Sequence, residues 1–170
     1  MGREVRRVPA NWQHPRDAGG HLVPLLDGAF SAELSEWLEG ERRWLAGEQQ
    51  DYAAYPQIAW KPRGADKECT YTDWAGETPH AEDYMPEWPE SERTHWQMYE
   101  TTSEGTPLSP VMESPEALAH WLADNGASAF AGTTATYDQW LATIRRGFAP
   151  SAIDSPDTGM VSGVAALAAK

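Results

Sequence analysis

Cysteine is almost missing from this sequence: the single Cys69 rules out a disulfide within the chain and a cysteine-rich zinc site. Histidine pairs with the metal-binding spacings HxH, HxxxH and HExxH are missing too, so we predict no metal site and no cofactor. No apolar run approaches the about 20 residues of a membrane helix, and the charged start MGREVRRVPANWQHPRD lacks the apolar segment of a signal peptide. We therefore predict no membrane attachment and a place in the cytoplasm.

Positive charge is scarce as well. The 170 residues include 13 Lys and Arg against 26 Asp and Glu, which gives a net charge of −13. Nucleic-acid backbones and anionic membranes both attract proteins of the opposite charge, so we predict no direct binding to either. A basic protein is an allowed partner, and so is a protein whose nucleic-acid ligand an acidic chain can imitate. Solubility alone is the simpler explanation of the same charge.

Motifs typical of catalysis or nucleotide binding are also lacking. The sequence contains no G-x-S-x-G, no G-x-x-x-x-G-K-[ST] and no G-x-G-x-x-G. Cys69 has no histidine in its local sequence KECTYTD, which is typical of a thiol that packs as a small apolar side chain. The nearest approach to a metal cluster is HAED at 80–83, and such short acidic clusters are usually solvated. We therefore predict no catalytic residue.

Tryptophan is the residue type that is unusually abundant, with nine copies. Each buries a large area, so a few of them hold together a fold with little regular structure. A chain of 170 residues with 41% apolar residues suits one domain over residues 1–170. The segments described next predict an α+β fold: a small antiparallel sheet, two or three packed helices, and long irregular segments rich in Trp and Pro.

An extended segment opens the chain, and a Gly-Gly pair separates it from a predicted helix. Apolar residues recur at helical spacing over 30–45. Ser31 or Asp27 is expected to cap the start of this helix, and Gly47 to close its end. Gly40 lowers the helix propensity by about 1 kcal/mol relative to Ala, so we expect the helix to bend or to end early there.

Residues 49–92 are predicted to be an irregular, acidic insertion rich in aromatic residues. Their apolar residues follow neither the helical nor the strand period. A short strand near 69–72 or a helical turn near Glu90 is expected within the segment. A loop of this length is usually functional or disordered, and the aromatic residues favour packing on the rest of the protein. The stretch 68–92 has no Lys or Arg and eight carboxylates: Glu68, Asp73, Glu77, Glu82, Asp83, Glu87, Glu90 and Glu92.

Residues 93–147 predict a core of one strand, a loop and two helices. RTHWQMYET at 93–101 alternates apolar and polar residues, which indicates a half-buried strand, and 111–112 is expected to add a short second strand. Ser114-Pro115 has the residues favoured at a helix start, and Thr136 opens a T-x-x-Q capping box. The polar C-terminal tail ends in GVAALAAK, which is too short and small to define a packed helix alone.

Four segments together resemble a group of small proteins of bacteriophages and prophages. They are GREVRRVP at 2–9, WQMYETTSEGTPLSP at 96–110, SPEALAHWLADNGASAF at 114–130 and TATYDQWLATIRRGFAPSA at 134–152. The resemblance covers about half of the chain, and the acidic middle matches least. It implies a phage accessory protein that acts in the cytoplasm of a bacterial host. Some members of the group carry cysteine pairs that look like a metal site, which this chain lacks, and the resemblance transfers no catalytic residue.

The first candidate binding site is an acidic surface in which indole rings alternate with carboxylates. Carboxylates spaced like phosphates would imitate DNA, whose phosphates follow at about 1.7 Å along the duplex axis over both strands. Aromatic rings would anchor basic side chains through cation–π contacts. A solvated surface coil is the alternative. The predicted residues are Asp73, Trp74, Glu77, Glu82, Asp83, Glu87, Trp88, Glu90 and Glu92.

The second candidate site is the loop YETTSEGTPLSP at 99–110. Gly105 permits a positive φ, and two prolines stiffen the loop, which reduces the entropy lost on binding. Two aromatic residues are expected at its base, on opposite faces of the strand. A plain hairpin connection is the alternative. The predicted pocket residues are Trp96, Tyr99, Glu100, Ser103, Glu104, Thr106 and Ser109.

The preferred hypothesis is an acidic phage-type accessory protein that binds a host protein and occludes its basic nucleic-acid-binding surface. Such a protein would be an anti-defence or host-takeover inhibitor that acts as a DNA mimic, with electrostatic steering by the carboxylates. The first alternative is a domain that binds a small ligand or nucleotide, or an enzyme, with its pocket at the 99–110 loop. The second alternative is a structural protein of the virion. The sequence leaves the oligomeric state open.

Overall fold

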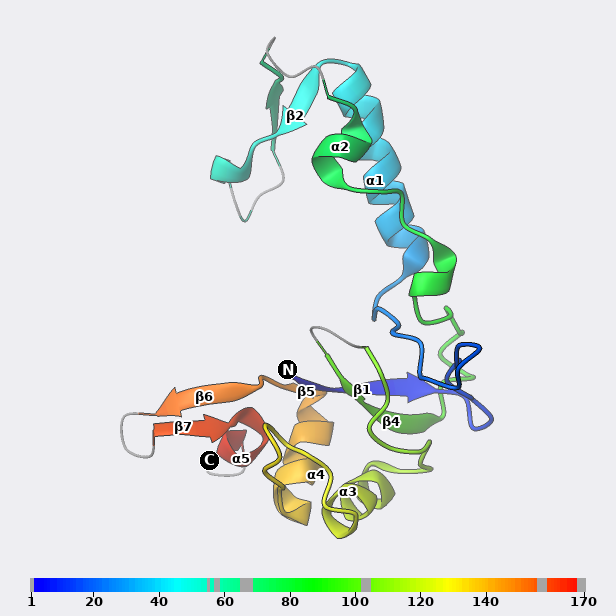
Figure 1. Ribbon diagram of the computed structural model, residues 1–170, viewed down its shortest axis with the longest axis vertical. Coiled ribbons are helices and arrows are strands. Elements are labelled where there is room, and N and C mark those ends of the chain that lie inside the picture. The colour runs from blue at the N-terminus through cyan, green and yellow to red at the C-terminus, as the bar shows by residue number, and fades with distance from the viewer. Residues whose placement is uncertain are drawn as a thin grey trace. The chain divides into compact units, whose positions relative to one another are not determined.

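The protein has an α+β fold in which helices accompany small antiparallel sheets, as predicted (Figure 1). The computed structural model describes residues 2–54, 56, 59–64, 69–101, 105–155 and 159–167. The chain forms two compact units: Met1–Asp27 with Trp88–Lys170, and Gly28–Glu87. The second unit contains the helix at 30–45 as well as most of the predicted insertion. None of the helices in the described ranges has the length and apolar character required to cross a membrane.

A three-stranded antiparallel sheet forms the middle of the first unit. Its strands are β1 (Arg3–Val8), β4 (His95–Glu100) and β5 (Phe148–Ala149), in the order β4-β1-β5. The register places Val5 of β1 opposite Met98 of β4. The N-terminal segment is therefore the middle strand, and it joins two segments that lie far from it in sequence.

Three helices pack against one face of this sheet: α3 (Pro115–Asp124), α4 (Tyr137–Arg146) and α5 (Gly163–Leu167) (Figure 1). The predicted caps of α3 and α4 are confirmed. The Ser114 hydroxyl accepts a hydrogen bond from the backbone N–H of Ala117, and Thr136 forms its capping box with Gln139. Each cap satisfies backbone N–H groups that have no partner inside the helix.

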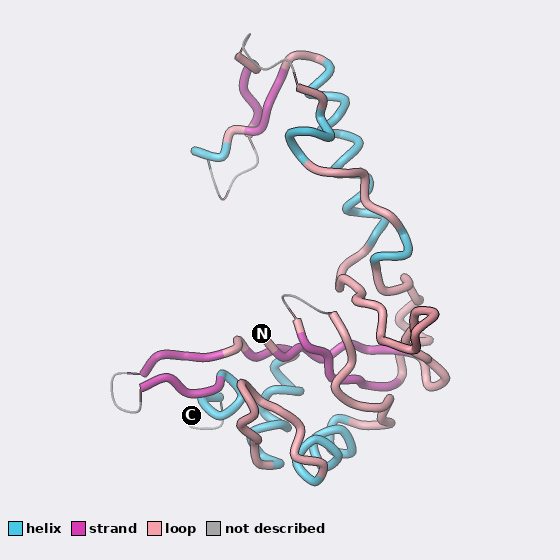
Figure 2. Tube along the Cα trace, in the orientation of Figure 1, coloured by secondary structure: helices cyan, strands magenta, loops and turns pink. Residues whose placement is uncertain are grey.

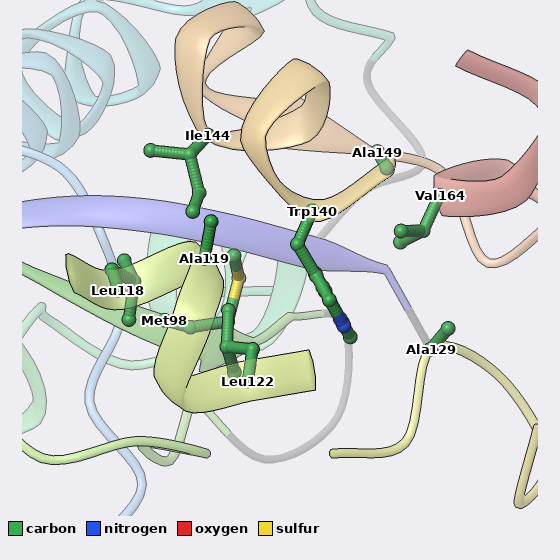
Figure 3. Close-up of a cluster of buried hydrophobic side chains, with 9 residues drawn as sticks. All are labelled: Met98, Leu118, Ala119, Leu122, Ala129, Trp140, Ile144, Ala149 and Val164. Atoms are coloured by element: carbon green, nitrogen blue, oxygen red, sulfur yellow. The ribbon is translucent and has the colours of Figure 1, made fainter. Parts of the chain in front are cut away.

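One cluster of buried apolar side chains joins the sheet to these helices (Figure 3). Met98 of β4 lies among Leu118 and Leu122 of α3 and Trp140 of α4, and all of these side chains are fully buried. Full burial of a Leu or Met side chain contributes about 1.5–3 kcal/mol, so the cluster supplies much of the unit's stability. Its other members are Ala119, Ala129, Ile144, Ala149 and Val164.

The C-terminal tail forms regular structure that its sequence does not predict. β6 (Ala152–Ser155) and β7 (Gly159–Ser162) pair as an antiparallel hairpin, and α5 follows directly. Val164 of α5 is fully buried in the core cluster. Gly163 permits this close approach, because a Cβ there would lie 2.1 Å from the carbonyl oxygen of Pro150. The short helix α5 therefore depends on the nearby Pro150 backbone, a contact that the sequence pattern does not reveal.

β4 is buried on both faces toward its C-terminal end, although its alternating sequence predicts one buried face. Met98 faces the helices, and Tyr99, which points to the opposite face, is fully buried as well. The segment that follows β1 provides the second cover, since Trp12 and His14 both contact the Tyr99 hydroxyl. Polar residues that suggested a solvent-facing side therefore lie under a layer of coil.

The second unit is built on one long helix, α1 (Phe30–Leu45), with α2 (Tyr71–Ala75) beside it (Figures 1 and 2). α1 runs without interruption through Gly40, so the predicted early end is wrong. The strand expected near 69–72 is wrong as well, because a capping box between Thr70 and Asp73 starts α2 there. The other described elements are the antiparallel pair β2 (Glu48–Gln50) and β3 (Trp60–Pro62), and the 3-10 helices η1 (Tyr52–Ala54) and η2 (Ala81–Asp83).

The start of α1 is capped by a residue from the other end of the unit. Ala29 is the N-cap residue and has no side-chain cap, so neither Ser31 nor Asp27 plays the predicted role. Instead the Glu87 carboxylate accepts hydrogen bonds from the Ser31 backbone N–H at 2.8 Å and from the Ser31 hydroxyl at 3.0 Å. These bonds lower the pKa of Glu87. A negative charge is favourable at a helix N-terminus, and this contact holds the two ends of the unit together.

Aromatic rings take the place of an aliphatic core in the second unit. The Trp44 ring stacks on Trp74 with 5.1 Å between centroids, and Trp37 packs edge-on against Tyr71, also at 5.1 Å. Tyr71 lies directly over Gly40, where a Cβ would be 1.9 Å from the tyrosine hydroxyl oxygen. Gly40 is thus the point at which the ring reaches the helix backbone, and this packing offsets its low helix propensity.

Replacing Gly40 by Ala should destabilise the protein, although Ala is the better helix former. The added methyl group would overlap Tyr71, and overpacking costs about 1–3 kcal/mol. Because Tyr71→Phe removes the nearest atom, G40A should cost less in that background than in the wild type. Chemical denaturation of the four proteins of this double-mutant cycle measures the difference. A G40A variant more stable than the wild type would refute the contact.

Candidate functional site

The loop YETTSEGTPLSP returns beside β4 as the second arm of a hairpin. The N–H of Glu100 donates to the carbonyl of Thr106 at 2.9 Å, and the N–H of Leu108 donates to Met98 at 2.7 Å. The second strand expected at 111–112 is an isolated bridge between Met112 and Trp96. Residues 102–104, which include the predicted pocket residues Ser103 and Glu104, lie outside the described residues.

Gly105 lies against backbone rather than above a cavity. Its φ is 51°, in the left-handed region, and its carbonyl accepts a hydrogen bond from the Leu25 N–H at 3.2 Å. A Cβ on Gly105 would lie 2.2 Å from the Leu25 carbonyl oxygen. The glycine is therefore needed for a close contact between the hairpin and the segment that covers β4.

The segment from Trp12 to Leu25 lies over β4 and is called the covering segment here. A network of polar groups fills the space between the covering segment and β4. The Trp12 indole N–H donates to the Tyr99 hydroxyl oxygen at 3.0 Å, and the Tyr99 O–H donates to Gln97 Oε1 at 2.9 Å. The Gln97 amide in turn donates to the Ser109 carbonyl at 2.8 Å. Burial raises the pKa of Tyr99 to about 12, so its hydroxyl keeps its proton and remains a donor in neutral solution.

His14 is held in a defined tautomer by the Val23 carbonyl. Its Nε2 is 2.6 Å from the Val23 carbonyl oxygen, which can only accept, so Nε2 carries the proton. Its Nδ1 is 3.2 Å from the Tyr99 hydroxyl. Burial lowers the pKa of His14, and the positive charges of Arg6 and Arg16 lower it further against the opposing effect of the Val23 hydrogen bond. The ring is therefore neutral in neutral solution.

A pocket of about 720 Å³ opens where the hairpin meets the covering segment. The apolar lining residues are prolines, leucines and Trp121 of α3, with Pro107 and Pro110 contributed by the loop. The polar lining residues are Gln13, His14, Arg16, Gln97 and Ser109. Both Gln97 and Ser109 are buried, so the hydrogen-bond network is the floor of the pocket.

Of the described residues that were predicted to form the loop pocket, only Ser109 lines it. Ser109 lines the pocket, whereas Tyr99 lies beneath its floor and Trp96 on the opposite face of β4, under Arg7 at 5.1 Å. The opposite placement of the two rings agrees with the strand alternation. Glu100 and Thr106 do not line the pocket either. Glu100 is 3.6 Å from the Arg3 guanidinium, and Thr106 is half-buried.

Sequence reasoning missed the lining residues of the covering segment. Gln13, His14 and Arg16 lie in a stretch without motif or periodicity, and only the fold brings them to the hairpin. The Gly19-Gly20 pair is the one local signal, because it indicates that the chain turns back after Arg16. The turn is indeed closed there, with the Asp17 carboxylate accepting from the N–H groups of Gly19 and His21.

All described carboxylates of the predicted acidic surface are exposed, but several are used by the fold. Asp73 caps α2 and Glu87 caps α1. Glu90 pairs with Arg7 at 2.8 Å and sits in a hydrogen-bonded turn, near where a helical turn was expected. Within the described residues no hydrogen bond or ion pair engages the side chains of Glu77, Glu82, Asp83 and Glu92. Glu68 lies outside the described residues.

The predicted surface is divided between the two units, and its tryptophans are packed. Trp74 stacks on Trp44 in the second unit. Trp88 belongs to the first unit, where its ring packs edge-on against Trp12 at 4.8 Å. Both rings are half-buried, so they contribute to the fold as well as to the surface.

No protein-family model, no curated protein and no solved structure matches the chain. Among the residues that the structure describes, no three His, Cys, Asp or Glu side chains gather as metal ligands do.

The contact between Gly105 and Leu25 predicts a difference between two glycine substitutions. Gly105 and Gly132 both have positive φ, 51° and 81°, so Ala at either position incurs the left-handed penalty of about 1–2 kcal/mol. No atom lies within 4 Å of a Cβ at Gly132, whereas the Leu25 carbonyl lies within 2.2 Å at Gly105. Gly105→Ala should therefore lower the free energy of unfolding clearly more than Gly132→Ala. Equal losses in denaturation would show that the loop does not depend on the Leu25 contact.

The pKa of His14 predicts a loss of stability on acidification. Since this pKa is lower in the folded protein than its usual 6.5, the unfolded chain binds the proton first. The free energy of unfolding should fall as the pH drops below 6.5, by at most about 1.4 kcal/mol per pH unit, until the folded-state pKa is passed. This contribution is absent in His14→Gln. The difference in free energy of unfolding between the wild type and the variant should therefore change with pH over that window. Denaturation at a series of pH values measures it, and a constant gap would contradict the assignment.

Proposed function

We propose that the protein binds a basic surface of another protein through its second unit and occludes it. The observation that carries the proposal is the local charge: Gly28–Glu87 contains thirteen carboxylates against five Lys and Arg. The larger first unit has thirteen against eight. Negative charge is therefore concentrated in the smaller unit, where it can steer a basic partner during encounter.

Carboxylates from different segments of the second unit gather around its tyrosines. The pKa of Tyr84 is raised first by burial and then by the negative charges of Glu33 in α1 and Asp83 in η2. The pKa of Tyr71 is raised by burial, and the charges of Glu36 and Glu41 add to the effect. The acidic residues are thus grouped in space as well as in sequence, which supports a common surface over separate solvated charges.

Exposed apolar side chains in the same unit could anchor the partner after encounter. Leu38 and Leu45 are 49% and 79% exposed, and they lie seven residues apart on one face of α1. Tyr52 is 66% exposed. Aromatic and aliphatic anchors beside charged groups are typical of protein interfaces, and the charge complementarity selects a basic occupant.

A nucleic-acid-binding protein is the partner class that fits this chemistry best. Its binding surface is basic, and a fixed set of carboxylates can occupy the positions of phosphates. The resemblance of segments 2–9 and 96–110 to phage proteins is the reason to look for this partner in the cytoplasm of a bacterial host. Occlusion of that surface would inhibit the partner without any catalytic step.

The test is competition with DNA for a purified basic bacterial DNA-binding protein, measured at low and high salt. Glu77, Glu82 and Asp83 are exposed and have no described partner, so their replacement by Gln, Gln and Asn should leave the fold intact. If each contact contributes the usual 0.2–1 kcal/mol of an exposed pair, the triple variant should bind about tenfold more weakly. Binding should also weaken with salt.

The matched control removes the same number of charges from the first unit. Glu113, Asp124 and Asp154 are exposed there and likewise have no described partner. Their replacement by Gln, Asn and Asn should leave the affinity unchanged. Equal losses of affinity in both triple variants would show that the net charge of the protein, and not the surface of the second unit, determines binding. Failure of the wild-type protein to bind such partners or to displace DNA at low salt would refute the proposal.

A further inference from the structure

We infer that the pocket of the first unit binds a small organic anion with a flat apolar body, such as an aromatic carboxylate or a nucleoside monophosphate. This site lies outside the second unit and goes beyond the proposed function. The volume of about 720 Å³ lies within the range of small-molecule sites. Its lining combines a cation, amide donors and an aromatic wall, which together define the ligand class.

The charge of the lining is opposite to that of the protein. No Asp or Glu is among the described residues that line the pocket, although carboxylates outnumber Lys and Arg two to one in the chain. Arg16 supplies a guanidinium that no described carboxylate neutralises; one of its nitrogens donates to the Gly20 carbonyl at 2.6 Å. The remaining N–H groups of Arg16 are left for an anionic group.

The nearest carboxylate in sequence, Asp17, forms no described ion pair with this guanidinium. Asp17 accepts hydrogen bonds from the backbone N–H groups of Gly19 and His21 and pairs with the His21 ring at 3.2 Å. These bonds lower the pKa of Asp17, chiefly through His21. The carboxylate is therefore engaged in its own turn, and the Arg16 charge remains available at the mouth of the pocket.

The floor of the pocket offers a second donor in a fixed position. Gln97 is buried, its Oε1 accepts from Tyr99, and one of its amide hydrogens is donated to the Ser109 carbonyl. The amide has two hydrogens, so one is left for a ligand. Because its other bonds hold the amide in place, this donor needs no reordering when a ligand arrives.

The apolar part of the lining suits a planar apolar body. Trp121, Leu22, Pro107 and Pro110 all line the pocket. An aromatic ring can stack on the indole face, and the stiff prolines keep the wall in shape. A purely apolar ligand would leave the Gln97 N–H and the Arg16 guanidinium without partners, which is unfavourable. The combination therefore selects an anion with an aromatic body.

The experiment compares charged probes with neutral analogues of the same shape. Indole-3-acetate is compared with indole-3-acetamide, and adenosine monophosphate with adenosine, by calorimetry and by NMR of the Trp121 indole and Gln97 amide signals. The charged member of at least one pair should bind about tenfold more tightly, the usual gain from a charge-assisted hydrogen bond. The two pairs distinguish a carboxylate ligand from a phosphate ligand.

Two arginine variants assign the effect to the pocket. Arg16→Gln should abolish the preference for the charged probe. Arg146→Gln is the control, because Arg146 is also exposed, has no described ion pair and does not line the pocket; it should keep the preference. The inference is overturned if neither charged probe binds in the millimolar range, if charged and neutral probes bind equally, or if the NMR shifts lie away from Trp121 and Gln97.

Discussion

The pairing of β1 with β4 is the interaction on which the first unit depends. β1 is the middle strand of the sheet and is covered on both faces, and its register with β4 decides which side chains lie on each face. On one face Val5 and Met98 meet the helices in an apolar cluster. On the other face Arg6 is buried with its guanidinium 4.3 Å from the centre of the Tyr99 ring. A buried charge has to be hydrogen-bonded, and the Leu25 carbonyl accepts from Arg6 at 2.9 Å.

The segment after β1 folds back over this face of the sheet and supplies that acceptor. Once Leu25 lies over Arg6, its backbone also lies against Gly105, and the hairpin is fixed at the same point. The intervening residues then bring Trp12 and His14 to the Tyr99 hydroxyl and place Arg16 at the edge of the hairpin. The pocket is thus a consequence of covering a charged strand face with coil.

The second unit is stabilised in a different way, because it has few aliphatic side chains to bury. Its described buried residues are few, and Trp44 is the largest of them. Stacked rings supply contact area, and two carboxylates, Asp73 and Glu87, supply helix caps. Since the rings occupy the interior, the other acidic side chains remain outside. A fold held together by indole and phenol rings tolerates a high density of surface charge, provided that the charges stay in water, where their repulsion is weak.

The features that were predictable from the sequence are those determined by neighbours in the chain. The caps at Ser114 and Thr136, the strand at 95–100 and the α+β class all follow from local spacing. The failures at Gly40 and at the pocket share one cause, contact between distant segments. Gly40 was read as a weak point of a helix because Tyr71, which packs on it, is thirty-one residues away. The pocket residues His14 and Arg16 were missed for the same reason, since they lie in a stretch without a recognisable pattern, whereas Ser109 belongs to the 99–110 loop.

The net charge of the chain matches the charge of the second unit but not that of the pocket lining. At physiological ionic strength a charge acts over about 8 Å, so a bound group responds mainly to the residues that line its own site. In the second unit those residues are carboxylates in excess, and the total of −13 describes them well. In the pocket they include Arg16 and no carboxylate among the described lining residues. The total opposes a phosphate backbone spread over the whole protein, but it leaves room for a single anion held by one guanidinium and one amide.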